Sequence, residues 1–252
     1  MPSIYLSPST QEFNPYAGGG NEEYYMNLIA DAMIPYLDAT GISYTRNTPQ
    51  MTAASSISAS NSGNYDLHLG LHSNAAPASN AGKIRGSEVY YYPSSTKGKR
   101  AADIIANNLK LIYPLPERVR TIPTTSIGEV SKVRAPAAFI EFAYHDNIED
   151  ADWIRNNIDK IAENIVVSLA DYFGIPFMMP GGNQNVPENS KNYAVVNTSG
   201  KNLNLRSAPN YNSEVIGSLP NGATVTVTSA LGEWKGVTYM GKSGFANAKY
   251  LK

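Results

Sequence analysis

The segment Asp66-Leu-His-Leu-Gly-Leu-His72 decides the fold, because leucine alternates in it with other residues. The three leucines share one face and the two histidines and the glycine share the other, which is the period of a β-strand. A second segment, 137–143, reads Ala-Ala-Phe-Ile-Glu-Phe-Ala and is apolar except for Glu141. Such a run is typical of a strand buried on both faces. We therefore predict two buried strands.

Strand-like and helix-like segments alternate around these two. A helix is predicted after Asn21, a good N-cap, with a kink at Pro35 and an end at Gly41. One long amphipathic helix is predicted over 149–173, whereas 48–64 shows little periodicity. Further segments are predicted as strands (4–6, 42–45, 87–92) and as a helix (101–112). This alternation predicts an α/β domain with a largely parallel sheet.

The composition of the chain changes at Pro176. The stretch 176–191 has no hydrophobic period and indicates a linker. Short strand-like segments separated by turn residues then follow to the end, and about 60 residues of this kind suit a small β-barrel. We predict an α/β domain at 1–175, a linker at 176–191 and an all-β module at 192–252.

The composition of the chain also limits its possible partners and metal ligands. With a net charge of −1 the chain has no strong attraction to nucleic acid or to an anionic membrane, and no apolar run is long enough to span a bilayer. No secretory signal is visible at the start, which predicts synthesis in the cytoplasm without export by a signal peptide. Cysteine is absent and histidine occurs three times, so a metal site must use histidine, carboxylate or weaker oxygen ligands.

Three polar positions are expected to meet at one sheet edge. Glu141 is a charge inside an apolar strand, and His72 ends another strand. Glu22 and Glu23 open a helix soon after the first strand. In open α/β sheets ligands bind beyond the carboxyl ends of strands. A histidine and two glutamates there suit a zinc ion with an open position and a general base.

Several motifs together resemble a known family over roughly residues 3–174. They are Asn21-Glu22, Asp66-Leu-His-Leu-Gly-Leu-His-Ser-Asn-Ala, Gly86-Ser-Glu-Val-Tyr-Tyr, and Pro136-Ala-Ala-Phe-Ile-Glu-Phe-Ala-Tyr-His-Asp-Asn with Asp150 beyond. They are similar to the zinc-dependent N-acetylmuramoyl-L-alanine amidases of the amidase-3 group. The resemblance implies a mixed six-stranded sheet flanked by helices, zinc ligation by Glu22 and His72, and catalysis by Glu141.

The start of the chain departs from that pattern. Family members usually carry Asp-Pro-Gly-His after the first strand, and that histidine is a zinc ligand. Here Thr10 stands at its place, with Gln11 next to it. Three outcomes are open: Gln11 or Thr10 supplies an oxygen, another histidine substitutes, or the metal is lost.

Alternatives remain for individual residues. Glu23 competes with Glu22 as ligand, since both open the same helix. His68 lies about 13 Å from His72 along a strand, at ~3.3 Å per residue, so we interpret it as structural. Asn74 and His145 are expected to contact substrate, and His145 is alternatively a replacement ligand or a turn histidine packing on Asp146.

The tail resembles bacterial SH3 (SH3b) domains. Its motifs are Leu203-Asn-Leu-Arg-Ser-Ala-Pro, Val215-Ile-Gly-Ser-Leu-Pro-Asn-Gly-Ala-Thr-Val-Thr-Val, Gly232-Glu-Trp-Lys, and Gly241-Lys-Ser-Gly-Phe-Ala-Asn-Ala-Lys-Tyr-Leu. The resemblance implies binding to cell-wall peptide or glycan. Trp234 and the tyrosines are candidates for the binding platform, although Trp234 suits the core equally.

The sequence thus predicts a peptidoglycan hydrolase that cuts the bond between N-acetylmuramic acid and L-alanine. Peptidoglycan is the expected partner, a monomer the expected state, and the bacterial wall the place of action, as for a phage or prophage endolysin. One rival is a non-catalytic wall-binding protein with a degenerate metal site. Another is a glycosidase that uses Glu22 and Glu141 as paired carboxylates.

Overall fold

The computed structural model describes residues 1–180, 193–240 and 242–252. The chain divides into two compact units, the first covering Met1–Phe173 and Met178–Pro180 and the second containing every described residue from 193 onward. Most of the predicted linker, 181–191, lies outside the described residues. The exact domain boundaries therefore stay predictions.

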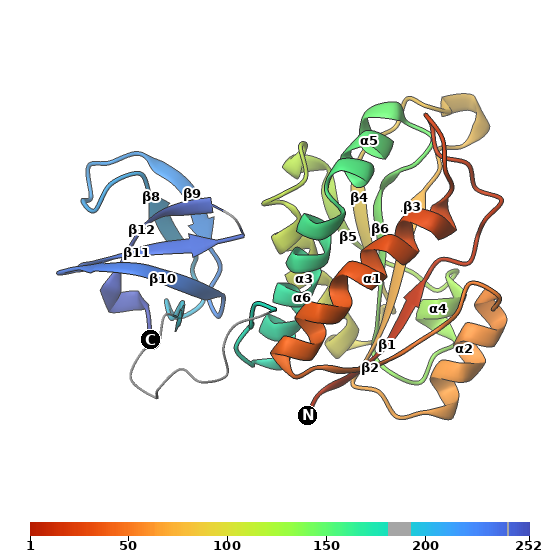
Figure 1. Ribbon diagram of the computed structural model, residues 1–252, viewed down its shortest axis with the longest axis horizontal. Coiled ribbons are helices and arrows are strands. Elements are labelled where there is room, and N and C mark those ends of the chain that lie inside the picture. Colours follow the sequence, from red (N-terminus) through yellow and green to blue (C-terminus); the bar gives the residue numbers. More distant parts are fainter. Residues whose placement is uncertain (181–192, 241) are drawn as a thin grey trace. The chain divides into compact units, whose positions relative to one another are not determined.

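The first unit is built on a six-stranded sheet with helices on both faces (Figure 1). The strand order is β2-β1-β3-β6-β4-β5. The strands are β1 (Ser3–Pro8), β2 (Ser43–Arg46), β3 (Leu67–Asn74), β4 (Ser87–Tyr91), β5 (Val119–Pro123) and β6 (Ala137–Tyr144). All neighbours are parallel except β4 and β6, which are antiparallel. The predicted mixed, largely parallel sheet is confirmed, and the two apolar segments are neighbours at its centre.

The helices form two groups on opposite faces of this sheet. Figure 1 shows α1 (Glu22–Thr40), α3 (Thr96–Leu109) and α6 (Ile158–Phe173) on one face, where both α1 and α3 pack on α6. On the other face, α2 (Ala53–Ser62) packs on α4 (Gly128–Ser131). Short α5 (Ile148–Asn156) precedes α6, and two 3-10 turns, Ala78–Asn80 and Pro116–Arg118, lie in loops. The core lies between these layers.

One helix was not predicted, and one helix prediction was wrong. The stretch 48–64 contains α2, whose N-cap Thr52 forms a capping box with Ser55. Its buried residues are Ser56 and Ser60 rather than apolar ones, so hydrophobic periodicity gives no signal. The predicted long helix over 149–173 is two helices separated at Asn157, whose side chain donates to the carbonyl of Trp153 at 2.8 Å. Gly41 ends α1 as predicted, with φ of 76°.

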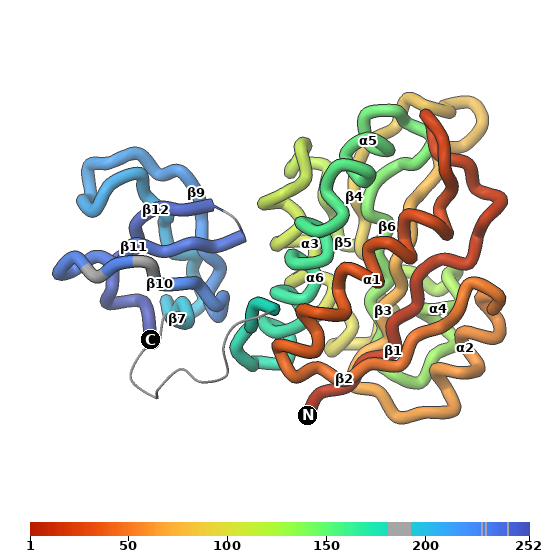
Figure 2. The backbone as a smooth tube through the Cα atoms, in the orientation of Figure 1, coloured from red at the N-terminus to blue at the C-terminus, as the bar shows by residue number. Residues whose placement is uncertain are grey.

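The second unit is an antiparallel six-stranded sheet of order β7-β10-β11-β12-β8-β9. The strands are β7 (Tyr193–Val195), β8 (Leu203–Arg206), β9 (Val215–Leu219), β10 (Thr224–Leu231), β11 (Trp234–Tyr239) and β12 (Lys242–Asn247), followed by the 3-10 turn Ala248–Tyr250. Val196 bridges Leu251, so the start of this unit meets its end (Figure 2). The predicted small all-β module is confirmed.

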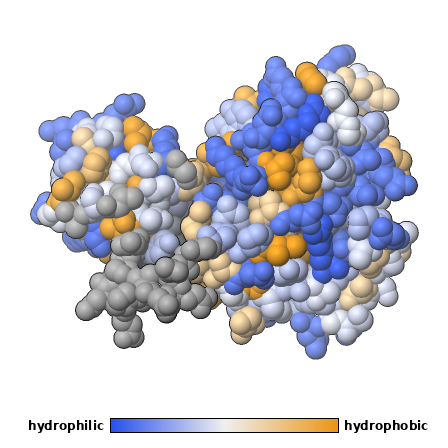
Figure 3. Space-filling view, viewed as in Figure 1, coloured by the Kyte–Doolittle hydropathy of each residue, from blue (hydrophilic) through white to orange (hydrophobic). Residues whose placement is uncertain are grey.

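The surface of the first unit is mixed. On the face shown in Figure 3, hydrophobic residues form small separate groups among hydrophilic ones. Among the described residues, no helix combines the length and the hydrophobicity that crossing a bilayer requires.

Candidate active site

His72 is positioned by packing at the centre of the sheet. Because Gly70 has no side chain, the ring of Phe139 on β6 lies directly over it; a Cβ at position 70 would stand 2.6 Å from Cδ2 of that ring. The His72 ring stacks on Phe139 with centroids 4.2 Å apart. The glycine of the Leu-Gly-Leu pattern therefore has a second role, because it leaves room for the Phe139 ring that supports His72.

Glu22, the first residue of α1, lies beside His72. It is 1% exposed, and its Oε1 lies 2.9 Å from Nδ1 of His72. Its Oε2 accepts a hydrogen bond from Nδ2 of Asn14 at 2.6 Å. Burial raises the pKa of Glu22, but the hydrogen bond and charge of His72, with Asn14 and Ser9, outweigh it and lower that pKa. Glu22 is thus held as a carboxylate beside the imidazole.

Gln11 is the third side chain at this point. Its Nε2 lies 3.4 Å from Nδ1 of His72, and its Oε1 accepts from Asn14 at 3.3 Å. Rotation of the amide by half a turn presents Oε1 to His72 instead. Within the described part of the chain, Thr10 makes no side-chain hydrogen bond to this cluster. Thr10 and Gln11 are the two candidates to take the place of the missing histidine, and the fold brings Gln11 to the site.

Glu129 is a site residue that the sequence analysis missed. It lies in α4 and is 5% exposed. Its Oε2 is 2.9 Å from Nε2 of His68, and its Oε1 is 3.5 Å from Nε2 of His72. The latter is an ion-pair distance without hydrogen-bond geometry. No apolar periodicity marks this four-residue helix, so the sequence offered no signal that Glu129 is buried between two histidines.

Carboxylates therefore flank His72 on both ring nitrogens. Burial lowers the pKa of His72, but the charges of Glu129 and Glu22 and the hydrogen bond to Glu22 outweigh this and raise it to about 10. The same contacts with His68 and His72 hold the pKa of Glu129 well below its usual range against the effect of burial. His68 is tied from its other nitrogen to Oγ of Ser60 at 2.9 Å. This buried series of side-chain contacts fixes the orientation of the His72 ring.

Glu141 lies beside this pair on the neighbouring strand. In the β3–β6 register it stands opposite His72, and in the β4–β6 register it stands opposite Glu88. Its Oε2 is shielded from solvent and has no hydrogen-bond partner among the described residues. Burial raises the pKa of Glu141 to about 8; the charge of His72 opposes this shift, and those of Glu22 and Glu88 add to it. A carboxyl group with a pKa near neutrality can accept and return a proton.

The remaining predicted residues lie around this centre. Asn74 donates to Oε2 of Glu88 at 3.2 Å, and Glu88 also pairs with Arg120. His145 is 4% exposed, and its Nδ1 lies 2.8 Å from the carbonyl oxygen of Ser73. Its ring also stacks on Tyr16. These contacts favour a structural role for His145, and its contact with substrate stays a prediction.

Glu23 does not share the position of Glu22. Although the two are adjacent on α1, no contact between Glu23 and His72 occurs among the described residues. Burial raises the pKa of Glu23, and the charge of Glu12 and a hydrogen bond to it raise it further. The tertiary structure thus places Glu22, and not Glu23, against the histidine.

The donor atoms fit a metal ion incompletely. Among the described residues, no group of three or more histidine, aspartate or glutamate side chains is arranged to hold one. Glu22 and His72 supply two strong donors 2.9 Å apart, and the amide of Gln11, a weaker neutral ligand group, approaches His72 through its Nε2. These residues therefore offer two strong ligand side chains and one weak one, fewer strong ligands than a zinc site usually has.

Comparison with known proteins finds a matching family for each of the two units. Residues 11–171 match the sequence profile of the N-acetylmuramoyl-L-alanine amidase family, and residues 201–252 match that of the bacterial SH3 domain. The chain belongs to the N-acetylmuramoyl-L-alanine amidase family and carries a bacterial SH3 domain. The family match begins at Gln11, after the segment that departs from the family pattern.

Individual relatives are more distant. The chain is 27% identical over 207 residues to "Probable autolysin PH" of Staphylococcus aureus (strain NCTC 8325 / PS 47), covering 71% of this chain and 41% of the relative. It therefore spans about two fifths of that protein's length.

Two solved structures share the fold of the first unit. The N-acetylmuramoyl-L-alanine amidase AmiC2 of Nostoc punctiforme has a TM-score of 0.60 at 18% identity, with 68% of this chain and 97% of that one covered. The catalytic domain of the CD27L endolysin targeting Clostridia difficile has a TM-score of 0.56 at 22% identity, with 68% and 98% covered.

Proposed function

We propose that this chain hydrolyses the amide bond between N-acetylmuramic acid and the L-alanine of the peptidoglycan stem peptide, and that its SH3 domain attaches it to the bacterial wall. Family membership of the first unit supports the reaction, and the bacterial SH3 domain supports the attachment. The observation that carries the proposal is the meeting of Glu22 and His72 beside the unpartnered oxygen of Glu141. A phage or prophage origin stays a prediction.

Glu22 and His72, with Gln11 as a weaker third ligand, are the residues that would hold zinc. A zinc ion bound there would supply a polarising positive charge and would lower the pKa of water. Glu129 faces Nε2 of His72, which leaves Nδ1 directed at Glu22. A carboxylate behind a ligating imidazole fixes its orientation and raises its basicity.

Glu141 is the proposed general base and acid. Its buried Oε2 accepts the proton of the attacking water and passes it to the nitrogen of L-alanine as the amide bond breaks. Asn74, whose amide donates to Glu88, is the proposed ligand for an amide of the stem peptide. The products are a free lactyl carboxylate on the sugar and a free L-alanine amine.

The test is hydrolysis of purified peptidoglycan by the full chain with zinc added. New L-alanine amino groups without new reducing sugar ends support the amidase. Reducing ends would instead indicate the glycosidase, although both carboxylate oxygens of Glu22 are already occupied by His72 and Asn14.

A second candidate is a non-catalytic wall-binding protein. It is favoured by one observation, the amide of Gln11 where a third strong ligand is expected. Wall binding without bound zinc and without released amino groups would establish it and overturn the amidase.

A further inference from the structure

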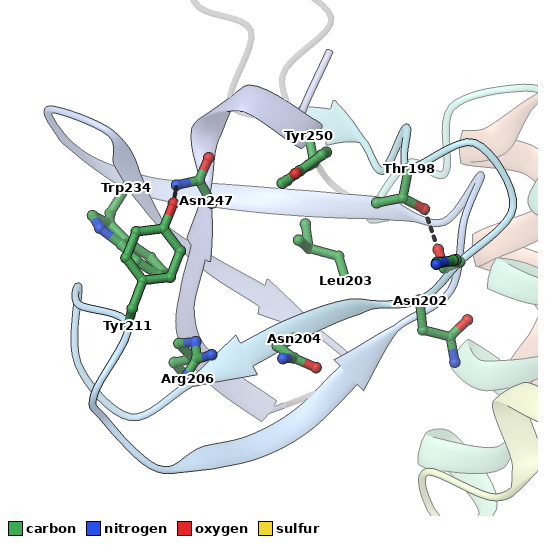
Figure 4. Close-up of a pocket in the computed structure, with 10 residues that line it drawn as sticks. Thr198, Asn202, Leu203, Asn204, Arg206, Tyr211, Trp234, Asn247 and Tyr250 are labelled. Atoms are coloured by element: carbon green, nitrogen blue, oxygen red, sulfur yellow. Dashed lines mark hydrogen bonds between the residues drawn. The ribbon is translucent and has the colours of Figure 1, made fainter.

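The second unit contains an open pocket of about 250 Å³ (Figure 4). Segments distant in the sequence converge on it: β8 and the loop before it, the loop after β8, the start of β11, the end of β12 and the final 3-10 turn. Leu203, 7% exposed, contributes apolar surface inside the pocket. A volume of this size holds one or two amino-acid residues rather than a long polymer.

One end of the pocket is built from aromatic side chains that are already engaged. Trp234 is 7% exposed and meets Tyr211 edge-on, with centroids 5.0 Å apart and planes at 66°. The Tyr211 hydroxyl accepts from Nδ2 of Asn247 at 2.7 Å, as Figure 4 shows. The face of Trp234 is thus not free as a flat platform for a sugar ring, which is how an exposed aromatic residue commonly binds glycan.

The polar lining has one sign of charge. Lys201 and Arg206 line the pocket, and among the described residues no aspartate or glutamate does. Within the described residues neither cation has an ion-pair partner within 4.0 Å; Nη1 of Arg206 donates to the carbonyl oxygen of Ser213 at 2.8 Å, which orients the guanidinium. The acidic residues Glu214 and Glu233 lie near in sequence but do not line the pocket.

Amide side chains complete the lining. Asn202 and Asn204 are exposed in the pocket, and among the described residues neither has a side-chain hydrogen bond to the protein. A carboxamide both donates and accepts, which matches the two groups of a peptide bond. Unpaired cations next to free amides therefore suit a short acidic peptide.

We propose that this pocket binds the free carboxylates of the peptidoglycan stem peptide, with Arg206 and Lys201 pairing with the carboxylates and Asn202 and Asn204 binding the peptide amides. The proposal rests on the proposed wall attachment and names the chemistry of the ligand. A planar guanidinium pairs with a carboxylate in a bidentate geometry, which gives direction as well as attraction. The glycan strand is neutral apart from its lactyl groups and leaves both cations unsatisfied.

The test uses the full chain labelled with ¹⁵N and the synthetic tripeptide N-acetyl-L-alanyl-γ-D-glutamyl-L-lysine. This peptide contains no muramic acid, so binding is measured independently of hydrolysis. The chain has two tryptophans, Trp153 and Trp234, one in each unit, so two indole N–H signals report the two units separately. The tripeptide is expected to shift the Trp234 signal and leave that of Trp153 in place.

The matched probe is the same tripeptide with both carboxylates converted to amides. It is expected to bind at least about tenfold more weakly, since it loses the charge-assisted hydrogen bonds. Equal binding of the acid and the amide would overturn the proposal. A Trp234 shift with tetra-N-acetylchitotetraose or with a glycerol phosphate oligomer, at concentrations where the tripeptide gives none, would also overturn it in favour of glycan or teichoic acid.

The variants are Arg206→Gln and Lys201→Glu, with Lys242→Gln as control. Lys242 is an exposed cation of the same unit outside the pocket. Both pocket variants are expected to weaken binding of the acidic tripeptide about tenfold or more, and the control is expected to leave it unchanged. Lys201 is exposed, so its variant tests the proposal even where Arg206→Gln disturbs the loop at Ser213. Wall hydrolysis without tripeptide binding refutes this inference alone, and the reverse result refutes the amidase alone.

Discussion

Nδ1 of His72 lies 2.9 Å from Oε1 of Glu22, although the two residues are 50 positions apart in the chain. His72 lies near the carboxyl end of central strand β3, and Glu22 is the first residue of helix α1. Both are almost fully buried, and a buried charged pair needs a reason to persist. The proposed reason is metal binding, and five predictions test it and the packing that supports it.

Glu22→Gln is expected to lower the affinity for zinc by at least about a hundredfold, because Glu22 is the single anionic ligand proposed for this site. Glu23→Gln is the matched control, one position along the same helix, and should bind zinc as the parent does. Calorimetry on the metal-free proteins measures both. Equal losses in the two variants would contradict the assignment of Glu22.

Gln11→His is expected to raise zinc affinity, since an imidazole is a stronger zinc ligand than the amide that it replaces. The position already faces His72. Thr10→His, one residue earlier, should give a smaller gain because Thr10 does not reach the cluster. Competition with a chromogenic chelator ranks the three proteins. A larger gain at Thr10 would show that the loop places that residue, and not Gln11, at the metal.

Glu141→Gln is expected to reduce the turnover of peptidoglycan by about 10²–10⁴-fold, the usual contribution of a general acid–base group. Zinc affinity should stay close to that of the parent, because Glu141 is not among the proposed ligands. Release of L-alanine amino groups measures turnover, and calorimetry measures zinc. Retained turnover in a folded variant would remove Glu141 from the mechanism.

Glu129→Gln is expected to lower zinc affinity by about 10–100-fold through the orientation of His72, since outer-shell partners of ligating histidines have effects of this size. The control is Glu117→Gln, which removes an exposed acid, 67% exposed at its side chain, from the same unit. Near-UV circular dichroism checks that the variant keeps its packing. An unchanged zinc affinity would assign Glu129 to the support of His68 alone.

Gly70→Ala is expected to lower the free energy of unfolding by about 1–3 kcal/mol, because the new methyl group meets the ring of Phe139. The ring supports His72, so zinc affinity should fall as well. The same substitution in a Phe139→Leu background should cost less, since the clash is removed. Urea denaturation of the four proteins gives the coupling. Additive costs would show that the ring does not mediate the effect.

Much of the fold could be predicted because local patterns agree with the tertiary arrangement. The alternation through His68 and His72 and the apolar run around Glu141 correctly indicated two buried strands. Helix α2 escaped prediction because its buried face consists of serines that hydrogen-bond to Asn47 and His68 rather than of apolar residues. The break at Asn157 escaped because the apolar spacing continues across it.

The sequence by itself determined the two-part organisation, the α/β class of the first unit and the family, since hydrophobic period, turn residues and motif spacing are local properties. The tertiary structure decided which side chains share a site. It brought Gln11 rather than Thr10 to His72, and it placed Glu22 rather than Glu23 there. It also put Glu129 between two histidines. The physical reason is that these side chains meet only where one loop and two helices pack against the sheet. That packing depends on the whole fold, and no local sequence pattern encodes it.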